Sequence, residues 1–367
     1  MPIGCCAISV RTPSSNTAER LFVLARVMGL AEHPLALTLG DPAGIGPDIT
    51  LLAWLAREHE PIPAFVLLGE ASVLATRAEA LRLRVPIATV VDPVVAEERF
   101  AEELPVISIA VAGTVVPGRP NGEAAAAVQE SIEKAVRLVQ AGEARAVVTN
   151  PISKAMLYRG GFAFPGHTEY LASLAATGGA VPHPVMMLAS KWLKVVPVTI
   201  HIPLKDVPAA LTEELILSTI ETTARDLDRF FGISRPRLVV TGLNPHAGEE
   251  GGLGREEIDI IQPAIEAARN KGLEVTGPYP ADTLFHAGSR ATYDAAICMY
   301  HDQALVPLKT LAFDEGVNIT LGLPFVRTSP DHGTAFTLAG TGKANPRSLI
   351  EALRLADAMS RQAERRA

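Results

Sequence analysis

One structural unit recurs from Pro34 onward and restricts the possible folds more than any other feature of the sequence. Each copy has a short apolar run, then a polar or Gly/Pro-rich turn, then a helical pattern. The apolar runs are PLALTLG, AFVLLG, RAVVTN, LKVVPVTI, RLVVTGLN and AAICMY. Strands without a polar face occur in sheets that helices cover on both sides, so the sequence predicts an α/β fold. Helices are expected over about 48–58, 71–83, 123–141, 206–230, 256–271 and 347–362.

The composition is typical of a globular chain with room for two lobes. The 367 residues are 48% hydrophobic and 20% charged, which is enough for an ample core. The 33 basic and 40 acidic residues give a net charge of −7 without a basic cluster, so we expect no nucleic-acid partner. Charges or prolines interrupt every apolar run well before the roughly 18 residues of a membrane span, so no membrane insertion is expected.

The first part of the chain does not share the recurring pattern. We interpret residues 1–31 as an N-terminal extension, with Met28 as a candidate for the working start codon, and a transit peptide is the alternative. The three cysteines, two of them adjacent at Cys5 and Cys6, form neither a disulfide framework nor a zinc-ribbon pattern. A cytoplasmic location is therefore expected.

Three histidines follow predicted strands. His201, His246 and His301 each stand at or just after the carboxyl end of an apolar run. Ligands of open α/β sheets bind beyond the carboxyl ends of the strands, so these side chains are expected at one rim. Three neutral imidazoles there would hold a divalent cation, and the nearby carboxylates of Asp302 and Asp282 would orient a ligand or bind the metal. The alternative is three ordinary histidines, because their spacing matches no local metal motif.

Other polar residues suit an anion. Lys309, Asn318 and Arg327 follow His301 between apolar segments, where Arg offers a planar fork and Lys a point charge. In the PGHTE segment at 165–169, a polar residue either caps a helix or contacts substrate. The glycines of GDPAGIGP at 40–47 match neither a dinucleotide fingerprint nor a phosphate loop. A tight strand-to-helix turn and a close approach of a ligand to the backbone both stay open there.

Together these segments resemble the 4-hydroxythreonine-4-phosphate dehydrogenase family of vitamin B6 (pyridoxal phosphate) biosynthesis. The resemblance extends from residue 35 to about 355, and the N-terminal extension is the part that the family usually lacks. The matching motifs are GDPAGIGPD (40–48), PGHTEYL (165–171), THIPL around His201, LNPHAGEEGGLGREEID (243–259), PADTLF (280–285), YHDQALVPLK (300–309), GVNITLGLPFVRTSPDHGTA (316–335) and AGTGKANP (339–346).

The resemblance implies roles for individual residues. The metal ligands would be His201, His246 and His301. The substrate contacts would be His167, Thr168, Lys309, Asn318 and Arg327. The cofactor would lie along His332, Gly333, Thr334 and Ala335, with Asn345 in the following segment. Lys309 and Asp282 are the candidates for the proton acceptor.

The resemblance also implies the fold of isopropylmalate and isocitrate dehydrogenases, with two α/β lobes around a cleft and a non-Rossmann NAD site. We expect residues 32–150 plus 310–367 to form the first lobe, and residues 151–309 to form the second with the metal and dimer contacts. Members of the family are homodimers whose active site takes metal ligands from both subunits. The three histidines therefore need not meet within one chain.

The implied reaction is NAD-dependent oxidation of 4-phosphooxy-L-threonine at its secondary hydroxyl. The product, 2-amino-3-oxo-4-phosphooxybutanoate, is a β-keto acid and loses carbon dioxide to give 3-amino-2-oxopropyl phosphate. NADP is an alternative to NAD, and zinc, magnesium and cobalt are the candidate metals. Three other functions stay open: a sister dehydrogenase of D-threonate or D-erythronate 4-phosphate, a metal-dependent phosphohydrolase, and a catalytically silent sensor of phosphorylated metabolites.

Overall fold

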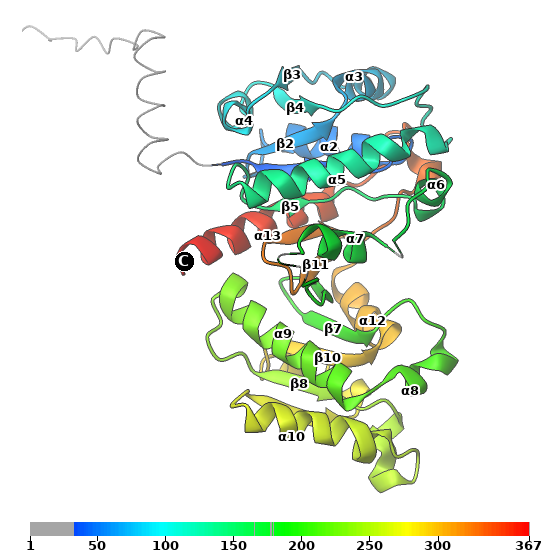
Figure 1. Ribbon diagram of the computed structural model, residues 1–367, viewed down its shortest axis with the longest axis vertical. Coiled ribbons are helices and arrows are strands. Elements are labelled where there is room, and N and C mark those ends of the chain that lie inside the picture. Colours follow the sequence, from blue (N-terminus) through cyan, green and yellow to red (C-terminus); the bar gives the residue numbers. More distant parts are fainter. Residues whose placement is uncertain (1–32, 165, 177, 179, 367) are drawn as a thin grey trace, which may run out of the picture.

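The computed structural model describes residues 33–164, 166–176, 178 and 180–366, so the expectations for residues 1–31 lie outside the described residues. Within the described residues, twelve strands form one sheet in the order β3-β4-β2-β1-β5-β12-β11-β6-β7-β10-β8-β9. Figure 1 shows two lobes along the long axis of the molecule. The first lobe holds the strands from β3 to β12 in the sheet order, and the second holds those from β6 to β9. The α/β class predicted from the sequence is confirmed.

Antiparallel strands join two parallel parts of the sheet. The first part consists of β1 (Leu35–Thr38), β2 (Phe65–Gly69), β3 (Ile87–Val90), β4 (Leu104–Ser108), β5 (Val147–Val148) and β12 (Arg327–Pro330). The second consists of β7 (Lys194–Thr199), β8 (Leu238–Thr241), β9 (Val275–Tyr279) and β10 (Ala295–Tyr300). Between them, β11 (Val317–Leu321) pairs antiparallel with β12 and β6 (Val185–Ala189), and β6 pairs antiparallel with β7.

Helices cover both faces because successive strand residues point to opposite sides. In β1, Leu35 and Leu37 contribute to one core and Ala36 to the other. The first core also holds α2 (Gly46–Ala56), α3 (Ala71–Ala80), α9 (Glu213–Phe231), α10 (Gln262–Asn270) and α13 (Arg347–Glu364). The opposite face packs against α4 (Pro93–Arg99), α5 (Ala125–Gln140), α6 (Lys154–Arg159) and α7 (His167–Leu174) in the first lobe, and against α12 (His301–Ala312) in the second.

Short helical segments complete the described chain. They are η1 (Gly122–Ala124), η2 (Leu204–Asp206), α8 (Val207–Ala210), η3 (Pro245–Gly251), η4 (Glu257–Ile261), η5 (Ala281–Thr283), α11 (Ala287–Arg290) and η6 (Phe336–Leu338). None of the helices in the described part of the chain is both long and apolar enough to cross a membrane.

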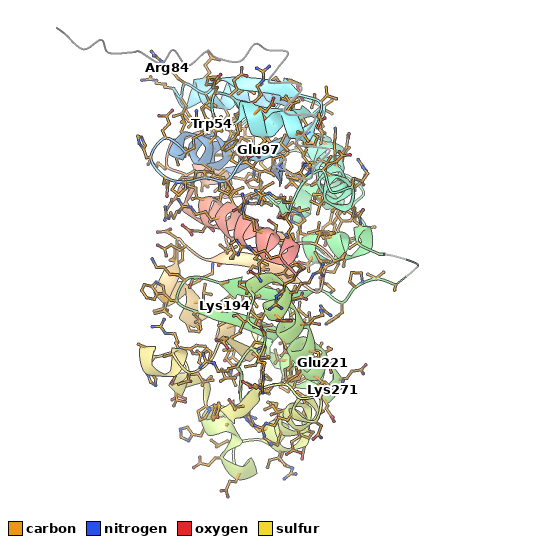
Figure 2. The ribbon with its side chains drawn as sticks, turned by 90° about the vertical axis from the view of Figure 1, so that its left-hand side faces the viewer. Trp54, Arg84, Glu97, Lys194, Glu221 and Lys271 are labelled. Carbon is orange, nitrogen blue, oxygen red and sulfur yellow. The ribbon has the colours of Figure 1, made fainter. Side chains whose placement is uncertain are left out.

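Side-chain contacts support each lobe. In the first lobe, Trp54 is buried and its indole Nε1 donates to the carbonyl oxygen of Phe100 at 3.0 Å. In the second lobe, Glu221 of α9 forms an ion pair with Lys271, which follows α10, and Figure 2 shows these two side chains side by side. The first contact links α2 to the end of α4, and the second links α9 to the end of α10.

The single helix expected over 206–230 is two helices in the structure, α8 and α9. It is divided, because Leu211 adopts an extended conformation and Thr212 begins a new helix by accepting a hydrogen bond from the Leu215 backbone N–H at 3.1 Å. A hydroxyl in this position satisfies one of the unpaired amides at a helix start. The pair Thr212-Glu213 is typical of a helix start. The apolar periodicity of the whole segment nevertheless favoured one continuous helix.

The predicted boundary between the two lobes differs in part from the packing of the helices. Residues 154–159 and 167–174, which the sequence places in the second lobe, fold as α6 and α7 and pack against α5 in the first. Helix α13 contacts both β12 and α9, and it lies between the lobes in Figure 1. The division of the chain at residue 150 stays a prediction.

Candidate active site

A cavity of about 430 Å³ lies where the two lobes meet. Its walls come from the end of β5, the start of α7, the loop after β7, helix α12, and strands β11 and β12. The residues predicted for the site that line it are His167, His201, His301, Lys309, Asn318, Arg327, His332 and Gly333. Segments that are far apart in the sequence therefore meet at one cavity.

In the polar segment after β10, residues 301–303, Gln303 supports the fold and His301 lines the cavity. The side-chain Oε1 of Gln303 accepts hydrogen bonds from Thr241 Oγ1 and from the Met299 backbone N–H, both at 2.7 Å. Its Nε2 donates to the carbonyl oxygen of Gly242 at 2.8 Å. Gln303 thus ties the ends of β8 and β10 together, and this contact fixes the first turn of α12, where His301 lies.

His201 and His301 form one half of the expected metal site. Their ring centroids lie 5.6 Å apart. His301 Nδ1 lies 2.7 Å from Asp302 Oδ1, and because an ionised carboxylate only accepts, this contact leaves His301 Nε2 available for a cation. Burial, followed by the nearby charges of Lys154 and His301, lowers the pKa of His201. The imidazole is then neutral, as a metal ligand must be.

His246 lies apart from this pair. Its side chain is 71% exposed, and its Nδ1 lies 3.3 Å from Glu249 Oε2. Among the residues that the structure describes, no three His, Cys, Asp or Glu side chains are grouped to hold a metal ion. One chain thus brings together two imidazoles of the predicted metal site, His201 and His301, and the third, His246, lies elsewhere.

The loop that carries His246 has an unusual backbone. All residues from His246 to Glu250 have positive φ angles, a conformation that only glycine adopts without strain. Buried Glu257 supports the loop, since its Oε1 accepts from the backbone N–H groups of Leu243 and Asn244, each at 2.8 Å. Its Oε2 also accepts from Asn244 Nδ2 at 3.0 Å. The carboxylate thereby fixes the chain entering the turn that holds His246 in solvent.

Arg327 lines the part of this cavity that is predicted to bind an anion, which we call the anion pocket and which also includes His167 and Asn318. It is only 4% exposed, and its guanidinium donates to Thr149 Oγ1 at 2.7 Å and Thr320 Oγ1 at 3.0 Å. Burial lowers its pKa to about 10, so it stays charged at neutral pH. In the described part of the chain, it has no carboxylate within ion-pair distance, and its Nε has no hydrogen-bond partner. A buried cation without a counter-ion is costly, which points to an anionic ligand.

His167 and Asn318 complete this pocket. Asn318 Oδ1 and His167 Nδ1 each lie 3.5 Å from a guanidinium nitrogen of Arg327. Burial, with smaller contributions from Arg327 and Lys154, holds the pKa of His167 well below its usual 6.5. The neutral ring can then present a donor to an anion. Thr168 follows His167 in the first turn of α7 but does not line the cavity.

The two candidates for the proton acceptor have different positions. Lys309 lines the cavity, and its Nζ lies 2.9 Å from Asp331 Oδ2. Asp282 lies exposed in η5 and does not line the cavity. Of the two, Lys309 is within reach of a ligand bound beside Arg327.

The segment expected to hold the cofactor packs against the glycine-rich turn after β1. The Ile45 backbone N–H donates to the carbonyl oxygen of Thr334 at 2.9 Å, and a Cβ on Gly44 would meet that oxygen at 2.9 Å. The Gly340 N–H donates to Asp48 Oδ1 at 2.8 Å. GDPAGIGP is therefore a strand-to-helix turn whose glycine allows the loop at 332–335 to approach.

The remaining cofactor candidates are near this loop. Ala335 has a positive φ of 40°, and Asn345 Oδ1 accepts from the Arg347 backbone N–H at 3.0 Å at the start of α13. His332 and Gly333 line the cavity, whereas Thr334, Ala335 and Asn345 do not. Burial lowers the pKa of His332.

Some residues of the site were not predicted. Thr149 and Thr320 hold the guanidinium of Arg327, and Asp331 pairs with Lys309. Asp331 had a usable signal, because it is an acidic residue directly before His332 at the end of a polar strand. The two threonines had none, since a hydroxyl inside an apolar run is an ordinary strand residue.

A second cavity, of about 740 Å³, lies against edge strand β9. None of the residues predicted for the site line it, and Arg237, which does, is paired with Asp294 at 3.0 Å. We assign the active site to the smaller cavity because the unpaired buried charge lies there.

The α/β fold and the buried guanidinium in the smaller cavity indicate an enzyme with a cavity between two lobes that suits an anionic ligand. The model of the family described as "Pyridoxal phosphate biosynthetic protein PdxA" matches residues 61–356, and the chain belongs to this family. The resemblance found in the sequence is therefore confirmed.

Individual proteins agree with this assignment. The chain is 57% identical over 338 residues to a 4-hydroxythreonine-4-phosphate dehydrogenase of Bradyrhizobium diazoefficiens, covering 90% of this chain and 98% of that protein. A protein of the same name from Xanthobacter autotrophicus is 56% identical over 341 residues, covering 92% and 97%. The crystal structure of 4-hydroxythreonine-4-phosphate dehydrogenase from Klebsiella pneumoniae has a TM-score of 0.79 at 39% identity, covering 90% of this chain and all of that one.

Proposed function

We propose that this chain oxidises 4-phosphooxy-L-threonine at its secondary hydroxyl, with NAD as the hydride acceptor, in pyridoxal 5'-phosphate biosynthesis. The product, 2-amino-3-oxo-4-phosphooxybutanoate, then loses carbon dioxide to give 3-amino-2-oxopropyl phosphate. The main support is the buried guanidinium of Arg327, which has no carboxylate partner among the described residues. A phosphorylated substrate supplies the missing negative charge. Relatives that carry this activity in their names support the identity of the substrate.

The anion pocket would orient the substrate. Arg327 and Asn318 bind one charged end, with His167 as a neutral donor and Thr168 beside it in the first turn of α7. Lys309 adds a point charge from α12. Strands β11 and β12 hold Asn318 and Arg327 in register, so the carbon that gives up the hydride is held in one place.

Three histidines would hold the metal: His201 and His301 of one chain, and His246 from a second copy. A divalent cation bound there would supply Lewis-acid chemistry, which would polarise an oxygen of the substrate. The chain prepares this site by keeping His201 neutral and by orienting His301 through Asp302. Zinc, cobalt and magnesium are the candidate metals, and imidazole ligands favour the first two.

We propose that the active unit is a homodimer with shared sites. His246 lies exposed on its strained turn, as expected of a side chain that acts in another subunit. Helix α12, which begins at His301, also leaves Val306 exposed, and Phe313 is exposed just after the helix. A second subunit would cover these apolar side chains.

The nicotinamide cofactor would lie along His332, Gly333, Thr334 and Ala335, and reach Asn345. We propose NAD as the natural cofactor and treat NADP as the alternative to be tested. Lys309 is the proposed proton acceptor, because it lines the cavity and Asp282 does not. Its substitution should flatten the pH profile of turnover and leave metal binding intact.

The deciding experiment measures NADH formation by purified, metal-loaded protein. The substrates are 4-phosphooxy-L-threonine, D-threonate 4-phosphate and D-erythronate 4-phosphate, each with NAD and with NADP. We expect turnover with the amino acid that a chelator abolishes and added metal restores. Preference for the sugar-acid phosphates would show that the substrate assignment is wrong, and release of inorganic phosphate without cofactor would indicate a phosphohydrolase.

A further inference from the structure

Lys309 and Asp331 meet across the cavity from different parts of the fold. Lys309 belongs to α12, which packs on β7 and β10 of the second lobe. Asp331 follows β12, which pairs with β5 of the first lobe. The Lys309 Nζ lies 2.9 Å from Asp331 Oδ2, and it donates to the Asp331 carbonyl oxygen at 3.2 Å. One residue of the first lobe thus contacts the ammonium through two oxygens.

Asp331 is held firmly in place. Its side chain is 11% exposed, and its backbone N–H donates to Ser348 Oγ at 3.0 Å. The Ser348 hydroxyl in turn donates to the carbonyl oxygen of Gly316 at 2.8 Å. Helix α13 and the start of β11 therefore fix Asp331 before any ligand binds.

Lys309 has no comparable support of its own. Its side chain is 33% exposed and, in the part of the chain that the structure describes, Asp331 supplies both oxygens within bonding distance of Nζ. Arg327, by contrast, is fixed by burial and by two hydroxyl groups. A flexible ammonium loses much rotamer freedom when a ligand orders it, unless a partner has ordered it beforehand.

We infer that Asp331 is a positioning residue, which holds the Lys309 ammonium at the cavity wall so that a remaining N–H faces the ligand. An ammonium has three donors, and the contacts with Asp331 leave room for a ligand oxygen. The inference rests on the proposed function, because Lys309 acts there as a substrate contact and proton acceptor. Asp331 itself acts through Lys309.

A double-mutant cycle tests this dependence. The four proteins are the wild type, Asp331→Asn, Lys309→Met and the double variant, and the measured quantities are kcat and KM for 4-phosphooxy-L-threonine. We expect Asp331→Asn to lower kcat/KM by roughly 30-fold in the wild-type background and by less than about twofold when Lys309 is already replaced. Asp331→Glu, which keeps the charge, should recover part of the activity. Equal effects in both backgrounds, or no effect of Asp331→Asn, would overturn the inference.

A matched control distinguishes this pair from lysine–carboxylate pairs in general. Lys191 and Glu315 lie 3.1 Å apart on the surface, away from the cavity. Glu315→Gln should leave kcat and KM unchanged. If Asp331→Asn does not fold, Ser348→Ala tests the same inference, because it removes the acceptor that fixes the Asp331 backbone. It should lower kcat/KM only where Lys309 is present.

A binding measurement separates failure of this inference from failure of the proposed function. If the wild type oxidises none of the three phosphates, the proposed function is wrong, and calorimetric binding of inorganic phosphate becomes the readout. Asp331→Asn should then bind phosphate more weakly than the wild type, by roughly threefold to tenfold, and the difference should disappear in the Lys309→Met background. Equal or tighter binding by Asp331→Asn would refute the positioning role.

Discussion

The anion pocket and the His246 loop provide their functional side chains in opposite ways. Arg327 projects from the central strand β12 and is buried. It donates to the hydroxyl of Thr149, which directly follows β5, and to that of Thr320, which lies within β11. His246 stands on a surface turn between β8 and η4, with its ring in solvent. Within the described residues, the contacts of Arg327 are complete in one chain, whereas His246 lies apart from His201 and His301. Under the proposed function, anion binding would therefore belong to the subunit, and metal binding would belong to the dimer.

Both regions store an energetic cost, although its nature differs. In the pocket the cost is electrostatic, because a buried guanidinium without a counter-ion loses hydration. In the loop the cost is conformational, on the order of 1–2 kcal/mol for each non-glycine residue in the left-handed region. A ligand can offset the first cost, whereas buried Glu257 offsets part of the second within the chain.

The largest expected effect comes from removing the unpaired charge. Arg327→Met should lower kcat/KM for the phosphorylated substrate by about a thousandfold, because two or more charge-assisted hydrogen bonds are lost. Steady-state kinetics with NAD gives the value, and circular dichroism checks the fold. Arg99→Met, at an exposed arginine paired with Glu103, is the control and should be neutral. A loss below about tenfold would mean that Arg327 does not bind the substrate.

The second prediction tests which region depends on the partner. His246→Ala and His301→Ala should each abolish metal binding and turnover as homodimers. When equal amounts are unfolded together and refolded, half of the dimers are mixed, and each mixed dimer has one intact site. Activity should return to about a quarter of the wild-type value.

The same experiment has a matched negative arm. His201→Ala mixed with His301→Ala should recover nothing, since these two rings lie together in one chain. Recovery in that mixture, or its absence with His246→Ala, would contradict the assignment of His246 to the neighbouring site. Metal content by atomic spectroscopy should follow the activity in each mixture.

The sequence predicted the pocket better than the loop, and the reason is geometric. The apolar run AAICMY became β10 without a change of boundaries, so His301 could be placed at the end of a strand. Asn318 and Arg327 were likewise recognisable as isolated polar groups between apolar segments. The hydroxyls that hold Arg327 were not, because Thr149 and Thr320 reach it only through the pairing of β5, β12 and β11.

The loop could not be predicted in the same way. Its left-handed conformation includes His246, Ala247 and Glu249, and nothing in these residue types predicts a positive φ. The carboxylate that supports it, Glu257, is one of several acidic residues in that segment, and only the fold shows which of them is buried. Long-range contacts therefore determine the parts of the site that local patterns leave open.

A smaller effect is expected from the support of the loop. Glu257→Gln replaces an acceptor of three hydrogen bonds by an amide that can satisfy fewer of them, and should lower the free energy of unfolding by about 1–3 kcal/mol. Urea denaturation measures this loss. Glu256→Gln changes a half-buried neighbour that accepts one hydrogen bond, from Asn244 Nδ2 at 2.7 Å, and should cost less than Glu257→Gln. If the two variants are equally stable, the buried carboxylate does not support the turn.

The smallest expected effect is on the pH dependence of stability, to which His167 of the anion pocket contributes through its lowered pKa. Because the pKa of His167 in the folded protein lies well below 6.5, the unfolded chain binds the additional proton once the pH falls under that value. Stability is unaffected by this group above about pH 7, and it decreases as the pH falls, by at most about 1.4 kcal/mol per pH unit. His167→Asn should remove this part, so that its melting temperature falls less than that of the wild type between about pH 7.5 and about pH 5.5. If the melting temperatures of the two proteins change equally with pH, His167 is protonated within the fold. A charged imidazole would then lie beside Arg327, and an anionic substrate would neutralise both cations.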